Sequence, residues 1–318
     1  MSQNALYNRY LHSPKVKQIA ENLEQPLVKI QLKGLLGSSF SFVFNALFKN
    51  SEKPYLLIFN EKEEAAYYLN DLEQMIGAND VLFYPSSYRR PYQIEETDNA
   101  NVLLRSEVLN RINSRKKPAV IVTYPEALFE KVVTRKELDK NTLKVAVGDN
   151  VSIDFINEVL FEYEFKRVDF ITEPGEFSVR GGILDVFSFS NDNPYRIEFF
   201  GNEVDSIRTF DVESQLSVEK QNKITIIPNL ENKFIQENRE SFLEYISNKT
   251  VLCIENTEFL TSQLDKLFGK AIETFDKLSK DVKHASPEQL FLNQEGFLKK
   301  ALDFSLIELS NKPLFKTT

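Results

Sequence analysis

Short apolar runs and longer segments with helical spacing alternate along the first 124 residues. After a short apolar stretch at Leu27 and a glycine-bearing turn, apolar runs follow at 55–59, 81–84 and 120–124. The segments between them carry apolar residues at helical spacing, as in 61–76 and 102–112. Strands that alternate with helices in this way predict βαβ units and a parallel sheet. The first part of the chain is therefore expected to be α/β.

Between Glu173 and Asp211 the pattern changes to alternation of single apolar and polar residues. The alternation breaks at Gly181-Gly182 and at 191–194, and it resumes at Tyr195. This period is that of half-buried strands, and the breaks have turn chemistry, so the segment predicts a small antiparallel meander. A strand at 143–147 and a helix at 152–163 precede it and suggest an α+β insert. The predicted core positions of the meander are Phe177, Ile183, Val186, Phe199, Ile207 and Phe210.

The last third of the chain is less regular. We predict a strand at 223–228, a helix at 230–247, and a buried strand at 250–254 that returns to the first sheet or to one beside it. The segment 290–318 has moderate apolar content and no recognisable closing element, which suggests that the sequence belongs to a longer protein. The predicted ranges are an α/β domain at 1–126, an inserted α+β domain at 127–211, and a second α/β part at 212–318.

Composition and charge narrow the function classes. The chain has 318 residues, which favours two or three compact units, and a single cysteine, Cys253, which excludes a disulfide framework and a cysteine zinc site. The two histidines lie far apart in the sequence, and no metal site is predicted. A net charge of −8 argues against autonomous DNA binding. The absence of a bilayer-length apolar run or a signal-peptide core predicts a cytoplasmic protein with no membrane contact.

A turn between the first strand and its helix has the spacing of a phosphate-binding loop. Gly34 and Ser41 match the frame G-x-x-x-x-G-K-[ST], but Ser39 replaces the second glycine and Phe40 replaces the lysine. Losing the lysine would remove about 4 kcal/mol of phosphate attraction. The favoured interpretation is that Gly34 and Gly37 only make a turn and that Phe40 packs in the core; residual weak nucleotide binding is the alternative. No hydrolysis is expected in either case.

A second segment has the form of a Walker B strand without its chemistry. Four apolar residues, 251–254, are followed by Glu255 and Asn256, where an aspartate and a glutamate would hold magnesium and orient water. With the altered loop, this pattern suggests a degenerate P-loop NTPase-derived domain.

The meander sequence strongly resembles a module shared by two bacterial families. Its Arg180-Gly181-Gly182 turn, the run 183–187 and the segment 196–211 are similar to UvrB and to the transcription-repair coupling factor (Mfd) family. Only about ten residues separate the loop at Tyr84–Gln93 from the helix that starts near Val102, which leaves no room for the aromatic hairpin of UvrB. With Phe40 in the loop, the sequence resembles the N-terminal UvrB-homology region of the coupling-factor family.

This resemblance implies a parallel-sheet, helicase-like domain split by an inserted UvrA-binding domain. It implies a non-catalytic segment without cofactors, in a parent whose ATP- and Mg-dependent translocase displaces lesion-stalled RNA polymerase on DNA and then recruits UvrA. It also suggests an intramolecular contact with the C-terminal region of the parent. The alternatives are a UvrB-like ATP-dependent helicase or excision-repair subunit, and an autonomous DNA-binding domain.

The same resemblance assigns the residues that would contact UvrA. Arg180 precedes the paired glycines, and an arginine there can meet a carboxylate with both arms of its planar group. Lys166 and the adjacent Arg167 correspond to a second basic position of the family. Phe187 is assigned either to the core or to the docking face.

Four acidic residues in the meander, Asp185, Glu198, Asp205 and Asp211, follow the spacing of strands and turns. No nucleophile or histidine lies near them in the sequence, so they are not predicted to be catalytic. We expect them to be outward strand positions or partners of Arg196 and Arg208, as cross-strand pairing favours.

Overall fold

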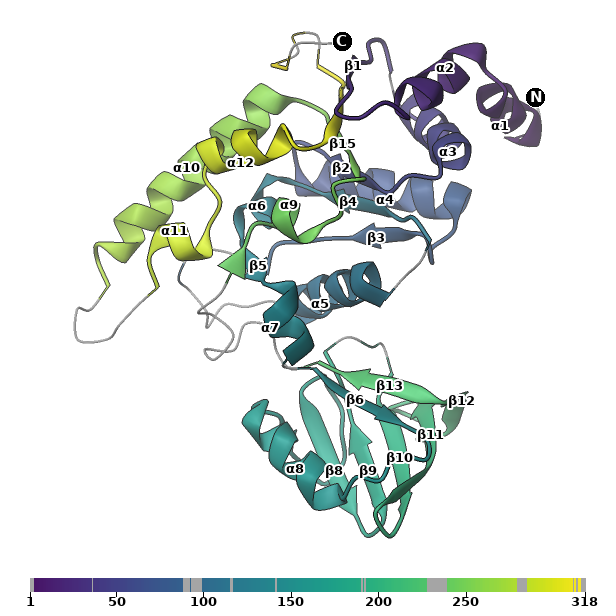
Figure 1. Ribbon diagram of the computed structural model, residues 1–318, viewed down its shortest axis with the longest axis vertical. Helices are drawn as coiled ribbons and strands as arrows, with labels where there is room; N and C mark the ends of the chain where they lie inside the picture. Colours follow the sequence, from purple (N-terminus) through teal and green to yellow (C-terminus); the bar gives the residue numbers. More distant parts are fainter. Residues whose placement is uncertain are drawn as a thin grey trace. The chain divides into compact units, whose positions relative to one another are not determined.

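The computed structural model describes residues 3–35, 37–87, 92, 99–114, 117–140, 142–189, 191, 193–227, 239–278, 285–310, 312 and 314–315. The chain divides into two compact units, shown in Figure 1. The α/β unit comprises 1–97, 111–132 and 240–318, and the meander unit comprises 98–110 and 133–239. The meander unit is therefore formed by segments that lie between segments of the α/β unit in the sequence. The meander unit includes residues beyond the range 127–211 predicted for the inserted domain. The predicted domain ranges stay a prediction.

A six-stranded, all-parallel sheet forms the centre of the α/β unit. Its spatial order is β1 (Lys29–Gln31), β16 (Ser305–Glu308), β15 (Val251–Ile254), β2 (Tyr55–Ile58), β4 (Val120–Thr123) and β3 (Val81–Phe83). The four predicted N-terminal strands are confirmed, and so is the return of 250–254 to the first sheet. Two strands from the end of the chain separate β1 from β2.

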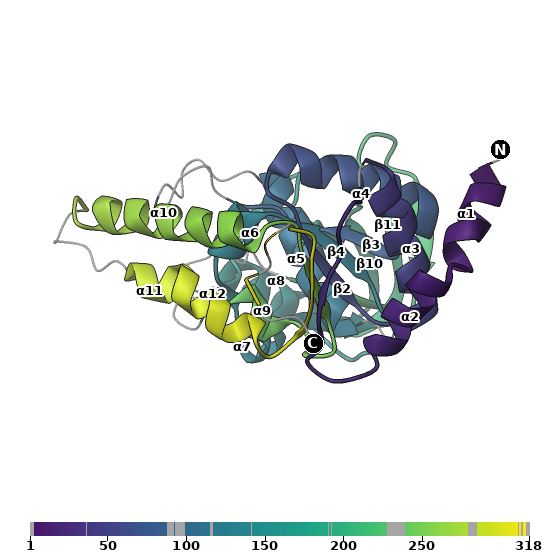
Figure 2. The ribbon, with the colours of Figure 1, turned by 90° about the horizontal axis from the view of Figure 1, so that it is seen from above.

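Burial on both faces explains the continuous apolar runs of the central strands. Every residue of β2, β4 and β15 is buried, as expected where helices cover both faces of a parallel sheet. The helices of this unit are α1 (Gln3–Leu11), α2 (Pro14–Asn22), α3 (Ser39–Ser51), α4 (Lys62–Ile76), α6 (Pro125–Phe129), α9 (Phe242–Tyr245), α10 (Thr257–Phe275), α11 (Pro287–Leu290) and α12 (Gln294–Ala301); α5 (Asn99–Ser114) belongs partly to each unit. Figure 2 shows α10 alongside α11 and α12. None of the described helices combines the length and apolarity that a bilayer crossing requires.

Two predictions for the last third of the chain are corrected. Residues 230–238 of the predicted helix 230–247 lie outside the described residues, and within 239–247 only α9 is helical. A capping box formed by Ser241 and Glu244 starts this short helix, and Arg239–Glu240 is the strand β14, which pairs with β5 (Val132–Val133). The segment after Leu290 also does contain sheet structure, because β16 takes an interior place between β1 and β15.

A second six-stranded sheet dominates the meander unit. Its order is β12 (Ser217–Gln221), β11 (Glu203–Phe210), β10 (Tyr195–Phe200), β9 (Ile183–Val186), β8 (Glu176–Arg180) and β7 (Lys166–Arg167). The strands β8 to β12 are antiparallel, which confirms the predicted meander, whereas β7 joins β8 in parallel. The unit also contains α7 (Arg135–Lys140), α8 (Ile153–Glu162) and the antiparallel pair β6 (Leu143–Ala146) and β13 (Lys223–Ile226).

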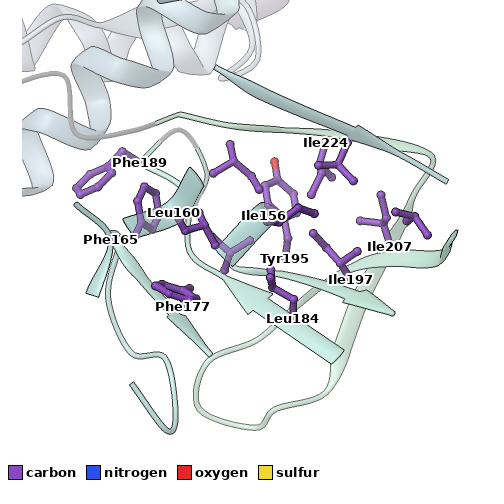
Figure 3. Packing of buried hydrophobic residues seen from close by; sticks show 14 of the residues in the cluster. Ile156, Leu160, Phe165, Phe177, Leu184, Phe189, Tyr195, Ile197, Ile207 and Ile224 are labelled. Carbon is purple, nitrogen blue, oxygen red and sulfur yellow. The ribbon is translucent and has the colours of Figure 1, made fainter. Parts of the chain in front are cut away.

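One face of this sheet carries the core of the unit. Alternate residues of β8, β9, β10 and β11 pack against Ile156 and Leu160 of α8 and against Ile224 of β13 (Figure 3). Of the predicted core positions, Phe177, Val186 and Ile207 are buried in this cluster, and Phe199 is partly buried against it. Ile183 is only partly buried, and Phe210 is fully buried in a separate small cluster with Ile171 and Phe187.

Candidate interaction face

The face of the meander sheet opposite α8 gathers charged side chains. Because strand residues alternate between faces, the neighbours of core residues such as Leu184 and Ile197 point to this opposite face. Cross-strand register places Asp185 beside Arg196 and Arg196 beside Arg208. We call the surface formed by Arg180, Asp185, Arg196, Glu198 and Arg208 the arginine face.

Asp185 is the centre of this face. Its side chain is 1% exposed, and its two oxygens accept hydrogen bonds from Arg196 at 2.7 and 2.9 Å. Arg180 Nη2 donates a further bond of 2.5 Å to Oδ2 of the same carboxylate. A buried carboxylate needs such partners, and its hydrogen bond to Arg196 raises the pKa of that arginine. Two guanidinium groups share one carboxylate, so the cluster keeps one surplus positive charge.

Glu198 and Arg208 form a second, more exposed pair. Arg208 Nη2 donates a 2.6 Å bond to Glu198 Oε1, and Ser206 Oγ donates a 2.7 Å bond to Oε2. These hydrogen bonds lower the pKa of Glu198. The expectation that acidic residues of the meander are outward or are partners of Arg196 and Arg208 is confirmed for Asp185, a buried partner of Arg196, and for Glu198, a partner of Arg208. Asp211 instead accepts hydrogen bonds from Ser214.

The paired glycines fix the turn that presents Arg180. Gly181 has a φ of +59°, a left-handed conformation that favours glycine. A Cβ on Gly182 would lie 3.0 Å from the backbone oxygen of Phe199 on the neighbouring strand. Gly181 is favoured by its backbone conformation, and Gly182 by the close approach of the neighbouring strand. Arg180 lies at the end of β8 with its side chain 42% exposed.

The other predicted contact residues are placed differently. Register sets Lys166 opposite Glu176 and Arg167 opposite Phe177, so only Lys166 shares the face of Arg180. Glu176 is four residues from Arg180, which puts Lys166 about 13 Å away along the strands. Both basic residues are exposed. Phe187 is 6% exposed and packs with Ile171 and Phe210, so it belongs to a core cluster.

Sequence reasoning missed the exposed aromatic residues Phe170 and Phe200 at the sheet of the meander unit. Phe170 is 66% exposed, and the guanidinium carbon of Arg180 lies 5.3 Å from its ring centroid. Phe200 is 83% exposed at the end of β10. The Phe199–Phe200 doublet contained a signal for the second residue, because adjacent strand residues face opposite sides of a sheet. No pattern in the sequence identified Phe170.

The phosphate-loop frame lies in the α/β unit and has the predicted strand, turn and helix. Gly34 and Gly37 have φ values of +80° and +53°, and α3 begins at Ser39. Phe40 is 3% exposed, with ring-centroid distances of 4.4 Å to Phe44, 4.7 Å to Tyr68 and 5.3 Å to Phe59. The interpretation that Phe40 packs in the core is confirmed. Ser41 is buried and donates a 2.9 Å bond to Asp71, so its hydroxyl serves the protein interior.

The Walker B-like segment ends in residues with structural roles. β15 and β1 belong to one parallel sheet, so Glu255 and the loop lie at the same edge. Glu255 Oε2 accepts a 2.9 Å bond from the backbone N–H of Asn60, and Asn256 caps α10 by accepting from Phe259 N. Burial, together with a hydrogen bond to Glu64, raises the pKa of Glu255 to about 7. Phosphate groups would meet carboxylates here, which disfavours nucleotide binding.

Glu255 should make stability depend on pH near neutrality. Its carboxyl titrates near ~4.3 in an unfolded chain and at about 7 in the folded protein. The folded state therefore holds the extra proton between these values, and the free energy of unfolding should fall as pH rises from about 5 to 7 and level off above. Glu255→Gln should remove this fall and be more stable than wild type at pH 8, by about 1 kcal/mol because the group is partly solvated. Denaturant unfolding of both proteins at several pH values measures the free energy of unfolding.

The exposed Glu273 of α10 provides the matched control, since Glu273→Gln makes the same chemical change outside this cluster. It should leave the pH profile unchanged. A wild-type free energy of unfolding that is constant between pH 5 and 8 would contradict the prediction.

Comparison with known proteins identifies a family and several relatives. The model of the UvrB interaction domain matches residues 143–231, which contain the arginine face. The transcription-repair-coupling factor of Bacillus subtilis (strain 168) is 32% identical over 237 residues, which are 74% of this chain and 20% of that protein. The protein of the same name from Myxococcus xanthus is 29% identical over 248 residues, 75% of this chain and 20% of the relative.

A shorter match agrees with these. The transcription-repair-coupling factor of Staphylococcus aureus (strain USA300) is 33% identical over 183 residues, 56% of this chain and 15% of the relative. The chain thus spans about a fifth of the length of the curated relatives it matches.

Proposed function

Because this chain is related to the UvrB-like N-terminal region of transcription-repair-coupling factors, we propose that it is a non-catalytic module that binds UvrA. The observation that carries the proposal is the cluster of Arg180, Asp185 and Arg196 on the face of the meander sheet opposite α8. Partly exposed arginines with fixed geometry are frequent anchors of protein interfaces. Lys166, on the same face, adds a second positive charge at the rim, and Arg167 is the adjacent basic residue. Phe187 packs in the small core cluster with Ile171 and Phe210.

The proposal places the chemistry in other parts of a longer protein. The full-length protein would use ATP and Mg²⁺ in a translocase, displace lesion-stalled RNA polymerase from DNA in the cytoplasm, and recruit UvrA through this segment. An intramolecular contact with its C-terminal region would control access to the arginine face. The aromatic packing around Phe40 and the carboxylates at Glu255 and Glu64 support a segment that neither binds nor hydrolyses nucleotide.

Titration of UvrA from the same organism with this 318-residue chain tests the function. Isothermal titration calorimetry should give saturable binding that weakens when the salt concentration rises, since exposed charges contribute to it. The chain should show no ATP hydrolysis alone or with UvrA beyond that of UvrA itself. Absence of a complex at about 10 μM of each protein would refute the proposal. Hydrolysis by the chain alone would favour the UvrB-like helicase instead.

A further inference from the structure

Arg180 is held from two sides by Asp185 and Phe170, which neither the sequence nor the family comparison assigns to it. Asp185 accepts a hydrogen bond from Nη2, and the ring of Phe170 lies 5.3 Å from the guanidinium carbon. The carboxylate is buried, whereas the ring is 66% exposed. A long side chain fixed in this way loses little conformational freedom when it binds a partner, which is the physical basis of preorganisation.

The segment that carries Phe170 is itself fastened to β8. On one side of Phe170, the backbone carbonyl of Asp169 accepts a 3.0 Å bond from Ser178 Oγ. On the other side, the backbone N–H of Thr172 donates a 2.8 Å bond to Glu176 Oε2. Both anchors belong to the strand that ends at Arg180. The ring is therefore positioned relative to the arginine that it covers.

Because Arg196 pairs with the same carboxylate, the positive charge of Arg180 is not fully neutralised. Arg196 donates two hydrogen bonds to Asp185 and lies 4.1 Å from the ring centroid of Phe210, on the buried side of the cluster. It can neutralise Asp185 alone, so Asp185 orients Arg180 without cancelling its charge. Among the described residues, the Arg180 side chain donates to Asp185 alone, and a planar group with further N–H donors and surplus positive charge best fits a carboxylate.

We propose that Phe170 and Asp185 are positioning residues that preorganise Arg180 for a carboxylate on UvrA. This role rests on the proposed binding to UvrA. Phe170 acts through its aromatic face and Asp185 through its charge. Neither residue needs to touch UvrA.

A comparison of Phe170→Leu with Phe170→Tyr tests the aromatic face. The residue is exposed, so neither change affects the core, and only tyrosine keeps a ring for the cation. Dissociation constants of the whole chain with UvrA should rise about three- to tenfold for leucine and stay within about twofold for tyrosine. In an Arg180→Ala background, leucine should cause no further loss. If that background binds too weakly to measure, Arg180→Gln, which keeps a polar side chain without a cation, replaces it.

These experiments distinguish failure of the positioning role from failure of the proposed binding to UvrA. Failure of the wild-type chain to bind UvrA would overturn the proposed function and this role together. If the wild-type chain binds and Phe170→Leu has an equal effect in both backgrounds, the ring contacts UvrA directly. If Phe170→Leu has no effect in either background, the ring does not contribute to binding. Either outcome overturns the positioning role but not the proposed function. Asp185→Asn keeps the side-chain shape and should weaken binding about tenfold, again only while Arg180 is present. Thermal unfolding checks that this buried variant remains folded.

Discussion

Replacing Arg180 by glutamate is expected to weaken binding of the chain to UvrA by at least about a hundredfold. Arginine anchors at the centre of interfaces contribute about 2 to 4 kcal/mol, and 2.7 kcal/mol corresponds to about a hundredfold. The reversal also places a second carboxylate next to Asp185, whose oxygen now accepts a bond from Arg180. The new side chain would therefore turn away from the surface and repel the carboxylate that the arginine is proposed to meet. Calorimetric titration or biolayer interferometry measures the change.

Lys223→Glu is the matched control, because Lys223 is an exposed cation of the same unit on β13, which packs on the opposite face of the sheet. It makes the same change of net charge and should shift the dissociation constant by less than about threefold. Arg180→Ala separates loss of the anchor from the added repulsion, and it should lose less affinity than glutamate. Binding by Arg180→Glu that stays within about threefold of wild type would remove Arg180 from the interface.

Replacing Phe40 by lysine should destabilise the protein rather than restore a nucleotide site. The substitution recreates the lysine of a phosphate loop, but the ring is 3% exposed among Phe44, Phe59 and Tyr68. Truncating a buried phenylalanine costs about 3–5 kcal/mol, and an unpaired ammonium group adds a desolvation cost. Denaturant unfolding should show a loss of about 3 kcal/mol or more, and ATP hydrolysis should remain absent.

Phe40→Leu is the control for this experiment. It keeps an apolar side chain and should cost about 1 to 2 kcal/mol, because the loss of volume is smaller. A Phe40→Lys protein that is as stable as wild type and binds ATP would show that the loop retains a nucleotide site.

Local patterns in the sequence were sufficient for most of the architecture. The apolar runs of β2 and β4 are continuous because both faces of a parallel sheet are covered, and the period-2 segments of β8 to β11 have one buried face. The strand β16 was missed because only Leu306 and Ile307 are apolar at its centre, and its place depends on strands almost 280 and about 55 residues away in the sequence. Such pairing is a tertiary effect that a short run cannot reveal.

The candidate site was predictable only in part, for related reasons. The position of Arg180 followed from its glycine turn and the family resemblance. Cross-strand geometry indicated that acidic residues of the meander could pair with Arg196 and Arg208, but not that Asp185 is the partner of Arg196. The assignment of Phe187 stayed open because it is the first residue after β9, where alternation no longer decides the face. Phe170 could not be identified from the sequence, because its position next to Arg180 depends on a loop that Ser178 and Glu176 hold to the sheet by hydrogen bonds.

The strand order of the α/β unit determines when its sheet can be completed during synthesis. β15 and β16 lie between β1 and β2, so the sheet cannot close until Glu308 has left the ribosome, 250 residues after Ile58 (308 − 58). At 5–20 residues per second this delay is roughly 10–50 s. The meander unit, complete by residue 239, can fold meanwhile. The apolar strand β2 must wait with one unpaired edge, and an exposed strand edge of this kind is the feature of unfinished chains that invites aggregation and that chaperones protect.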